Sequence, residues 1–486
     1  MRQPTTLTVA RGWTLAIAGF LTVLVLPATA SAALARATPP SPSRDLRTAA
    51  RSATRQVQPA TARQVVIAGI EGSVWGLPPV VMARVRARFL CSSAVNRLVD
   101  IPVLSNPSSR LVVTPNVDTL YSSAWLDLRR GPALIRVPEV TGRYYVLQLL
   151  DMYTNTFADI GTRATGTAAG TYAVVGPGWH GSVPPGAHRV VAPTPDVWII
   201  GRTLVRGPDD QAAAAVQRSI TLVPPDGSAP AVGTPELPLN ADCSSTGGPL
   251  VPTGPAFFGD LATIVAADPP PARDASVLRD LEPAGIRPGE RTAASLTPQM
   301  TAMLARGTTI GSTLLRQFAA TALRQVHGWT QLPSTGTYGD DYFARALAAQ
   351  VGLGANIPEE SVYYSASVDV TGTRLTGRNG YVLRFAPKST PPVTPDGFWS
   401  ITLYGPDHFL VANPEDRYAI GDRTPGLTQE PDGSLDLYIG GQPPPNRQAN
   451  WLPAPPGRFS LVLRAYLPTA AVRTNRWTPP GLELSG

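Results

Sequence analysis

The stretch that decides the fold class is RYYVLQLLD at residues 143–151, with HRVVAPTPDVWIIGRTL following at residues 188–204. The first stretch is apolar on both alternations, which predicts a central β-strand covered on both faces. Shorter segments with a period of two lie around it, namely LVVTPN at 111–116, LIRVP at 134–138 and TYAVVGP at 171–177. Short β-branched and aromatic strands separated by Gly and Pro turns predict antiparallel sheets, in a sandwich or barrel, rather than a parallel sheet.

A second region with the same period begins at residue 362 and continues to the end of the chain. Its strand-like segments are VYYSASVDV at 362–370, YVLRFAP at 381–387, GFWSITLYGP at 397–406, SLDLYIG at 434–440 and FSLVLRAYLP at 459–468. The two regions share this rhythm but no sequence repeat. We therefore expect two all-β units.

Helical periodicity separates and precedes these β regions. Residues 62–98 predict two helices that meet at a turn, Gly76-Leu77-Pro78-Pro79. Thr297 and Pro298 are a cap and a first-turn proline for a helix that we expect to reach about Val326. Gly307 and Gly311 on its apolar stripe predict close packing against a neighbour. A further short helix is expected from about Asp341 to Gln350.

The first residues have the pattern of a secretory signal peptide. Arg2 and Arg11 give a positive start, an apolar run from Leu15 to Leu26 follows, and Ala30-Ser31-Ala32 is a small-residue cleavage site. We expect a secreted or extracytoplasmic protein; the alternative is an uncleaved signal anchor. No later window is long and apolar enough to span a bilayer, so no stable membrane insertion is expected after cleavage.

These patterns give a predicted order of domains along the chain. Residues 33–60 are rich in Ala, Pro, Arg, Ser and Thr without apolar periodicity, which is typical of a disordered linker. The expected order is a signal peptide at 1–32, that linker, an N-terminal β domain with leading helices at 61–205, a Pro/Gly-rich and helical connecting region at 206–355, and a C-terminal β domain at 356–486.

The charge does not indicate a nucleic-acid partner. The net charge is +7 over 486 residues, and Lys388 is the only lysine among 41 basic residues. No run of arginines interleaved with aromatic residues forms the basic patch that nucleic-acid binding requires. We expect a mildly basic, solvated surface.

The chain has two cysteines, Cys91 and Cys243. An oxidising compartment permits a disulfide between them. The alternative is a buried free thiol at Cys91, because its helical stretch has the apolar neighbours Phe89 and Leu90.

Residues 114–151, TPNVDTLYSSAWLDLRRGPALIRVPEVTGRYYVLQLLD, carry a family resemblance. Together with WGLPPVVM at 75–82 and VWIIGRTL at 197–204, they resemble the N-terminal domain of a bacterial family named for domains of unknown function 1254 and 1214. DGFWSITLYGPDHFLVANPEDRYAIGDRTPGL at 396–427 and NWLPAPPGRFSLVLRAYLP at 450–468 resemble its C-terminal domain. The resemblance implies a mainly β fold with α: two antiparallel β-sandwich or jelly-roll-like domains with packed helices. It implies no reaction.

No standard catalytic signature is present. The sequence lacks a GxSxG elbow, a GxxxxGK[ST] loop, a GxGxxG after a strand and an HExxH. There are four histidines, and the usual metal-ligand spacing is missing. We therefore expect no metal and no organic cofactor.

The densest polar cluster lies in the N-terminal β region. We predict four catalytic residues, Asp118, Tyr121, Arg143 and Asp151, and five binding residues around them, Asn116, Tyr145, Tyr153, Asn155 and Arg163. A carboxylate, a phenol and a guanidinium that converge in an apolar cleft suffice for acid–base chemistry or for gripping a substrate carboxylate. The alternative is architecture: Asn and Asp form turns, and Arg143 pairs with Asp118 or Asp151 as a buried ion pair.

A second cluster lies in the C-terminal β region. Asp407, His408 and Arg417 are predicted to bind ligand from loops of a rigid β scaffold. Asp407 and His408 are adjacent, so on a strand they would point to opposite faces.

Three classes of function remain open at this stage. The sequence slightly favours a cofactor-free hydrolase or lyase that acts on a small organic molecule or saccharide. The alternatives are a ligand-binding protein and a structural protein of the cell envelope. The oligomeric state stays open.

Overall fold

The structure is a computed structural model, and it describes residues 60–109, 114–207, 210–225, 251–287, 289–290, 296–331 and 335–485. The predicted signal peptide, almost all of the predicted linker and Cys243 lie outside the described residues. Helices make up 27% of the described residues and strands 28%, in several sheets that are mainly antiparallel, with no closed barrel among them. The expectation of a mainly β fold with α-helices is confirmed, whereas the sandwich and jelly-roll detail stays a prediction.

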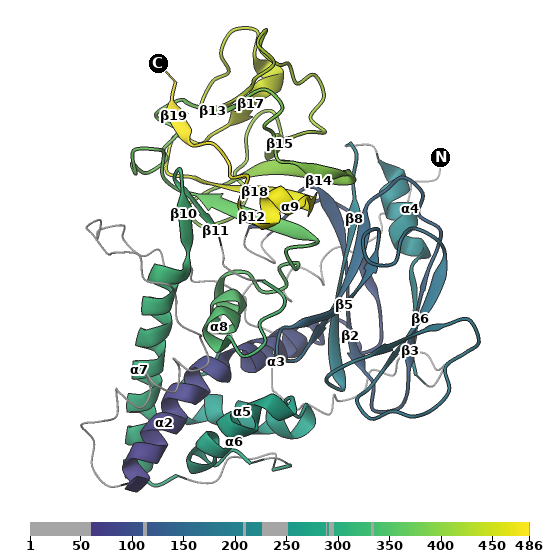
Figure 1. The fold of residues 1–486 in the computed structure, drawn as a ribbon, viewed down its shortest axis with the longest axis vertical. Helices are drawn as coiled ribbons and strands as arrows, with labels where there is room; N and C mark the ends of the chain where they lie inside the picture. The colour runs from purple at the N-terminus through teal and green to yellow at the C-terminus, as the bar shows by residue number, and fades with distance from the viewer. Residues whose placement is uncertain are drawn as a thin grey trace, which may run out of the picture.

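Two sheets form the N-terminal β unit (Figure 1). The five-stranded sheet has the order β1-β2-β8-β4-β5 and the four-stranded sheet the order β7-β6-β3-β9. Their strands are β1 Val99–Ile101, β2 Thr119–Asp127, β3 Ala133–Val137, β4 Tyr145–Asp151, β5 Thr156–Gly161, β6 Gly170–Val175, β7 His188–Val191, β8 Asp196–Leu204 and β9 Thr221–Val223. Facing side chains of the two sheets, such as Leu126, Leu147 and Ile135, form one shared core.

The stretch RYYVLQLLD behaves as its pattern predicts. Its strand, β4, is buried at every position and lies between β8 and β5. The predicted strand at 111–116 is wrong for the part that the structure describes, because Thr114, Pro115 and Asn116 lie outside any strand. Pro115 has no N–H for a ladder, and the Asn116 side chain accepts a hydrogen bond from the Asp118 N–H, which is a turn.

The C-terminal β unit also consists of two sheets. Their orders are β10-β11-β12-β18-β14-β15 and β17-β16-β13-β19. The strands are β10 Arg324–Val326, β11 Trp329–Gln331, β12 Ser361–Ala366, β13 Tyr381–Phe385, β14 Val393–Tyr404, β15 Ala419–Gly421, β16 Leu435–Gly440, β17 Trp451–Pro453, β18 Ser460–Pro468 and β19 Leu482–Leu484. Trp399 and Leu463 from one sheet and Leu383 and Leu437 from the other lie in one core.

Helices pack against one end of the five-stranded sheet. They are α2 Ala60–Trp75, α3 Leu77–Phe89, α5 Pro255–Ala267, α6 Ala275–Leu281, α7 Pro298–Ala322 and α8 Tyr342–Val351, whereas α4 Gln211–Ser219 and α9 Ala470–Arg473 lie on the β units. Within the described ranges, no single helix has the length and apolarity to cross a membrane, although α2 and α3, bent by 53° at their junction, pass that test as a pair.

The glycines of α7 have the role that the sequence predicts. A Cβ on Gly307 would lie 2.2 Å from the Val66 carbonyl oxygen of α2, and a Cβ on Gly311 would lie 2.1 Å from the Ser73 hydroxyl. Close packing of α7 on α2 is therefore confirmed. The predicted end of this helix is wrong: α7 stops at Ala322, and residues 324–326 form β10, which turns at Gly328 (φ 83°) into β11.

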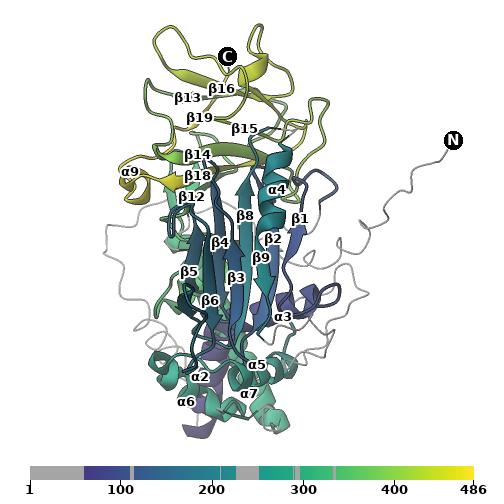
Figure 2. The same ribbon diagram turned by 90° about the vertical axis from the view of Figure 1, so that its right-hand side faces the viewer.

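The five-stranded sheet connects the helices to the C-terminal β unit. Figure 2 shows its strands running from the helices at the bottom to β14 and β18 at the top. We call the side of this sheet that faces away from the four-stranded sheet its inner face. Trp125, Leu150 and Trp198 of this face pack among the helices, whereas Val146 and Leu204 pack with Phe398 and Tyr466 of the C-terminal unit.

Candidate functional site

The inner face is polar between its two apolar ends. Alternate residues of β8 point to this face, and they are Asp196, Trp198, Ile200, Arg202 and Leu204. Arg202 therefore lies between the helix-facing residues and the contact with the C-terminal unit. Neighbouring strands place Tyr121 opposite Arg202 and Asp159 opposite Gln148. We call Tyr121, Gln148, Asp159 and Arg202 the polar band.

Arg202 is buried and lies in the middle of the polar band. Its guanidinium donates to Gln148 Oε1 at 2.9 Å, to Asn356 Oδ1 at 2.8 Å and to the Gly354 carbonyl oxygen at 2.7 Å. The Gln148 amide donates to the Ala355 carbonyl at 3.0 Å. Residues 354–356, which follow α8, therefore pack against the band. The Tyr121 ring lies 5.7 Å from the guanidinium carbon, within the range of a cation–π contact.

All direct partners of Arg202 are neutral. No carboxylate of the described residues lies within 4.0 Å of its guanidinium. Burial alone would lower the pKa of Arg202, but the surrounding phenols, with Tyr121 and Tyr363 first, raise it, so the group stays charged. The Tyr121 hydroxyl is half-buried and makes no hydrogen bond to another described residue.

The C-terminal unit contributes a second buried guanidinium. Arg464 of β18 lies opposite Tyr363 of β12 and Ser400 of β14 in register, so the three residues share one face of their sheet. It donates to Thr402 Oγ1 at 3.1 Å and to the Thr114 carbonyl at 2.8 Å, both neutral acceptors. The Tyr363 hydroxyl accepts a hydrogen bond from Asn356 at 2.9 Å, and Asn356 accepts from Arg202, so this tyrosine connects the surroundings of the two guanidiniums.

Two predicted residues, Asn116 and Asp118, bridge the two β units. Asp118 accepts a hydrogen bond from the Ser400 hydroxyl at 2.6 Å and forms an ion pair of 2.5 Å with Arg423. Asn116 donates to the Tyr466 hydroxyl at 2.5 Å. Both residues lie just before Tyr121 on β2, so the structure brings these three predicted residues together at the contact between the units.

A third predicted residue, Arg163, makes another bridge between the units. Its Nε lies 2.6 Å from Glu360 of the C-terminal unit, and its Nη2 lies 2.6 Å from Asp159. Burial and then the nearby Glu360 carboxylate raise the pKa of Asp159 to about 6, against the lowering effect of Arg163. The band therefore has one carboxyl group that titrates close to neutral pH.

Arg143 and Tyr145 lie away from the band. Arg143 donates to both oxygens of Asp210, at 2.6 and 2.9 Å, rather than to Asp118 or Asp151. Tyr145 points into the core between the two N-terminal sheets. The alternative for Arg143, a buried ion pair with Asp118 or Asp151, is therefore wrong, because its partner is Asp210.

Asp151, Tyr153 and Asn155 form a tight turn at the helix end of β4. The Asp151 carboxylate accepts from the backbone N–H groups of Tyr153 at 2.9 Å and Asn155 at 2.8 Å. Burial raises the pKa of Asp151 against these hydrogen bonds. The Tyr153 hydroxyl donates to the Asp268 carbonyl at 2.8 Å, among the helices.

The three predicted residues of the C-terminal unit, Asp407, His408 and Arg417, make hydrogen bonds to backbone groups of loops. Asp407 accepts from the Phe409 N–H at 3.2 Å, and Arg417 donates to the carbonyls of Gln448 and Trp451 at 2.6 and 2.9 Å. His408 has a φ of 62°, its carbonyl accepts from the Thr114 N–H, and burial lowers its pKa. These contacts do not gather the three side chains around one site.

Cys91 is exposed, in the turn after α3, so the alternative of a buried thiol is wrong. Cys243 lies outside the described residues, and the disulfide stays a prediction. No group of three or more His, Cys, Asp or Glu residues in the described ranges is placed to hold a metal ion.

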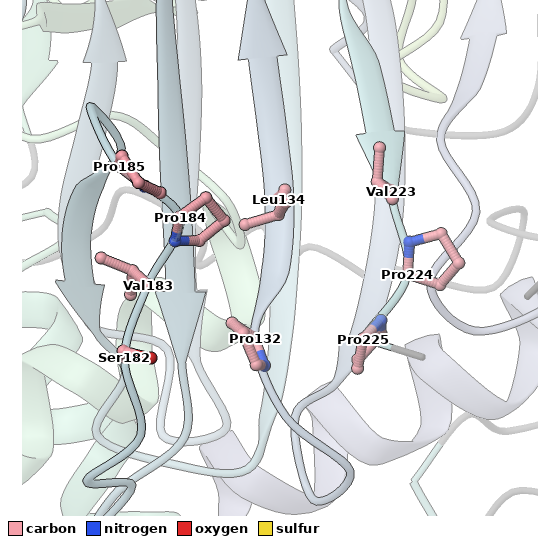
Figure 3. A pocket seen from close by; sticks show the side chains of 9 residues that line it. All are labelled: Pro132, Leu134, Ser182, Val183, Pro184, Pro185, Val223, Pro224 and Pro225. Atoms are coloured by element: carbon pink, nitrogen blue, oxygen red, sulfur yellow. The ribbon is translucent and has the colours of Figure 1, made fainter. Parts of the chain in front are cut away.

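Two open hollows lie on the outside of the N-terminal unit, away from the band. One, of about 520 Å³, is lined by Pro132, Leu134, Ser182, Val183, Pro184, Pro185, Val223, Pro224 and Pro225 (Figure 3). The other, of about 490 Å³, is lined by Asn96, Arg97, Leu98, Asp100, Ile220, Thr221 and Leu222. Neither hollow contains a predicted site residue.

The sequence did not predict three residues of the band, Gln148, Asp159 and Arg202, or four residues around it, Asn356, Glu360, Tyr363 and Arg464. A usable signal exists for three of them. Gln148, Arg202 and Arg464 are single polar residues inside apolar strand segments, RYYVLQLLD, VWIIGRTL and FSLVLRAYLP. A strand that is apolar on both faces is buried, so a polar residue inside it must have buried partners.

Family models match two parts of the chain. Protein of unknown function (DUF1254) matches residues 95–224, and Protein of unknown function (DUF1214) matches residues 360–470. No curated protein matches the sequence.

Two solved structures align with the chain, and the first of them shares its fold. The VPA0106 protein from Vibrio parahaemolyticus aligns with 21% identity and a TM-score of 0.66, over 87% of this chain and 100% of its own. A putative uncharacterized protein from Burkholderia cenocepacia aligns with 12% identity and a TM-score of 0.40, over 91% of this chain and 98% of its own. At this identity the first likeness concerns the fold alone.

Proposed function

This chain belongs to the bacterial family in which domain of unknown function 1254 precedes domain of unknown function 1214, and we propose that it is an exported protein that binds a small organic molecule at the polar band. The export part of the proposal is supported by the signal-peptide pattern of residues 1–32. Its test is N-terminal sequencing of the secreted protein: a start near Ala33 supports it, and an intact Met1 contradicts it.

The observation that supports binding is the environment of Arg202. A buried charge is costly unless it is paired, and buried polar groups normally satisfy each other within the protein. Arg202 has only neutral acceptors, and beside it the Tyr121 hydroxyl has no partner among the described residues. A positive group and an open hydroxyl at the meeting point of two β units are the kind of polar groups that orient a ligand.

The phenols around the band support binding rather than base catalysis. Burial raises the pKa of Tyr144, Tyr404 and Tyr466 above the usual value. These hydroxyls therefore stay protonated at neutral pH, where they donate hydrogen bonds and do not abstract protons.

The test is a thermal-unfolding panel of small acids, sugars and cell-wall fragments on the mature protein. A ligand that binds only the folded state stabilises it by about 2.7 kcal/mol at 100 times its Kd, whether or not it is turned over. We expect at least one stabilising compound, and its effect should weaken in Tyr121→Phe.

Tyr438→Phe is the matched control. Tyr438 is also a half-buried strand tyrosine, but it lies on β16, in the C-terminal sheet that does not carry Arg464. Its variant should respond to ligand like the wild type. Silence across the panel, or equal loss in both variants, contradicts binding at the band.

A hydrolase or lyase is the second candidate, and Asp159 favours it. Its pKa of about 6 suits a general acid or base at neutral pH. Turnover of a stabilising compound should then depend on a group with that pKa, and Asp159→Asn should abolish turnover while ligand binding remains. Binding without turnover leaves the first proposal standing and removes the second.

A further inference from the structure

The two buried guanidiniums, Arg202 and Arg464, have unused hydrogen-bond donors. An arginine side chain has five N–H donors. Arg202 makes three hydrogen bonds and Arg464 makes two to described residues. Half of their ten donors are thus left without a described partner, in residues that are only 7% and 4% exposed.

Two other buried arginines lie within ion-pair distance of a carboxylate. Arg86 is an ion pair with Asp196 at 2.9 Å, and Arg345 lies 4.0 Å from Asp274. At the band, the nearby acidic residues make their direct ion pairs elsewhere: Asp159 and Glu360 share Arg163, and Asp118 pairs with Arg423. A free carboxylate would therefore supply the missing direct counter-charge.

Charge-assisted hydrogen bonds are about twice as strong as neutral ones, and arginine matches a planar carboxylate in a two-point fork. The unused donors of Arg202 and the open Tyr121 hydroxyl lie on the same face of the sheet, because the two residues are direct cross-strand neighbours. Arg464 is the direct cross-strand neighbour of Tyr363, whose hydroxyl accepts a hydrogen bond from Asn356 at 2.9 Å, and Asn356 also accepts from Arg202 at 2.8 Å.

We infer that the ligand of the polar band is a small organic carboxylate, held by Arg202 and Tyr121 of the N-terminal unit and by Arg464 of the C-terminal unit. This inference rests on the binding role proposed above. It predicts that recognition depends on the negative charge of the ligand and that it joins the two β units.

The experiment compares acids with neutral counterparts of the same shape. The probes are succinate with succinamide, benzoate with benzamide, and galacturonate with galactose, plus inorganic phosphate. Thermal unfolding and titration calorimetry on the mature protein give the readouts. We expect at least one carboxylate to bind and its neutral counterpart to bind at least about tenfold more weakly, as loss of a hydrogen bond to a charged group predicts.

Two substitutions connect the effect to the band. Arg202→Gln should weaken carboxylate binding at least about tenfold, and Arg202→Lys, which keeps the charge without the fork, should weaken it less. Arg473→Gln is the control, because Arg473 is an exposed arginine whose partner is Glu359 at 3.7 Å. If Arg202→Gln does not fold, Arg464→Gln and Tyr121→Phe supply the same comparison.

The outcomes separate the inference from the proposed function. Equal binding of acids and neutral counterparts overturns the inference and leaves the binding role intact. Binding of phosphate without any carboxylate overturns the organic class. If none of these probes and no compound of the earlier panel binds, both the inference and the binding role fail.

Discussion

Asp196 and Arg202 lie on the same strand and the same face, six residues apart, yet their surroundings are opposite. Asp196 lies at the helix end of β8, with Arg86 at 2.9 Å and Arg129 at 3.0 Å. Arg202 lies in the polar band, with three neutral oxygen atoms. Both are buried, and only the first has its charge matched by direct opposite charges.

The helix end is a closed network of charges. Burial and then the adjacent Asp196 raise the pKa of Asp268, whereas Arg86 and Arg129 outweigh burial and lower the pKa of Asp196. Asp196 and Asp268 thus lie within ion-pair distance of Arg129, Asp196 also pairs with Arg86, and Arg129 also pairs with Asp127. The comparison teaches that a buried charge with matched partners serves architecture, while a buried charge with neutral partners leaves an interaction for a ligand.

The largest expected effect is at Asp196. Asp196→Asn leaves Arg86 and Arg129 buried with a neutral partner, and breaking a buried pair costs about 3–5 kcal/mol. Urea unfolding should show this loss, with Glu359→Gln, an exposed carboxylate, as the unaffected control. A loss below about 1 kcal/mol would show that the helix end does not depend on matched charges.

The contact between the β units should respond less strongly. Asp118→Asn removes the charged acceptor of Arg423 and Ser400, at a cost of about 1.5–3 kcal/mol, since Arg423 is partly exposed. A second variant, Asp118→Ala, tests whether Asp118 belongs to a ligand site or only holds the fold. In the thermal-unfolding panel, a folded variant that no longer binds ligand supports a ligand site. A variant that unfolds supports a purely structural role.

A pH-dependent effect is expected at Asp159. Its folded-state pKa of about 6 lies above the ordinary value of 3.8, so the folded state retains the proton longer than the unfolded state. This stability is complete below pH 3.8 and is lost as pH rises through 6.

The measurement compares the free energy of unfolding of the wild type and of Asp159→Asn, by urea unfolding between about pH 4 and pH 7.5. In this range the folded and unfolded states differ in protonation over about two pH units, from the ordinary pKa of 3.8 to about 6. Relative to the variant, the wild type should lose on the order of 2 kcal/mol as pH rises. Because Asp422 also has a pKa of about 6, its contribution cancels only in this difference. A constant difference across the range contradicts the raised pKa of Asp159.

The smallest effect is expected at the surface. Arg473 and Glu359 form an exposed pair at 3.7 Å, and Arg473→Ala should change the free energy of unfolding by less than about 0.5 kcal/mol. A larger loss would mean that exposed ion pairs also stabilise this protein. Burial would then not distinguish the ion pairs that matter for stability, which contradicts the comparison of Asp196 with Arg202.

Much of the fold follows from local pattern. The period of two predicted β4, β8, β12, β13, β16 and β18, and the cap and proline at Thr297 and Pro298 predicted the start of α7. The strands β2 and β5 were missed, and so were seven short strands: β1, β9, β10, β11, β15, β17 and β19. Each of these seven has three residues, which is too short for an alternation to be recognised.

The candidate site was predictable only in part. The motif PNVDTLY predicted that Asn116, Asp118 and Tyr121 act together, and the structure places them at the contact between the β units. It did not indicate that Arg143 pairs with Asp210, because the partner lies 67 residues away in the chain. A sequence pattern describes which face a residue occupies, but not what another segment brings to that face.

The sequence by itself determined the mainly β class, the helices α2, α3 and α8, the start of α7 and the two domains of unknown function. These follow from local periodicity and from motifs that each lie within one stretch of chain. Only the tertiary structure decided which buried charges are matched, because Asp196 meets Arg86 and Arg129 across three segments, whereas Arg202 meets Gly354 and Asn356. Charge pairing depends on distances of a few Å between distant segments, and these distances exist only once the chain is folded.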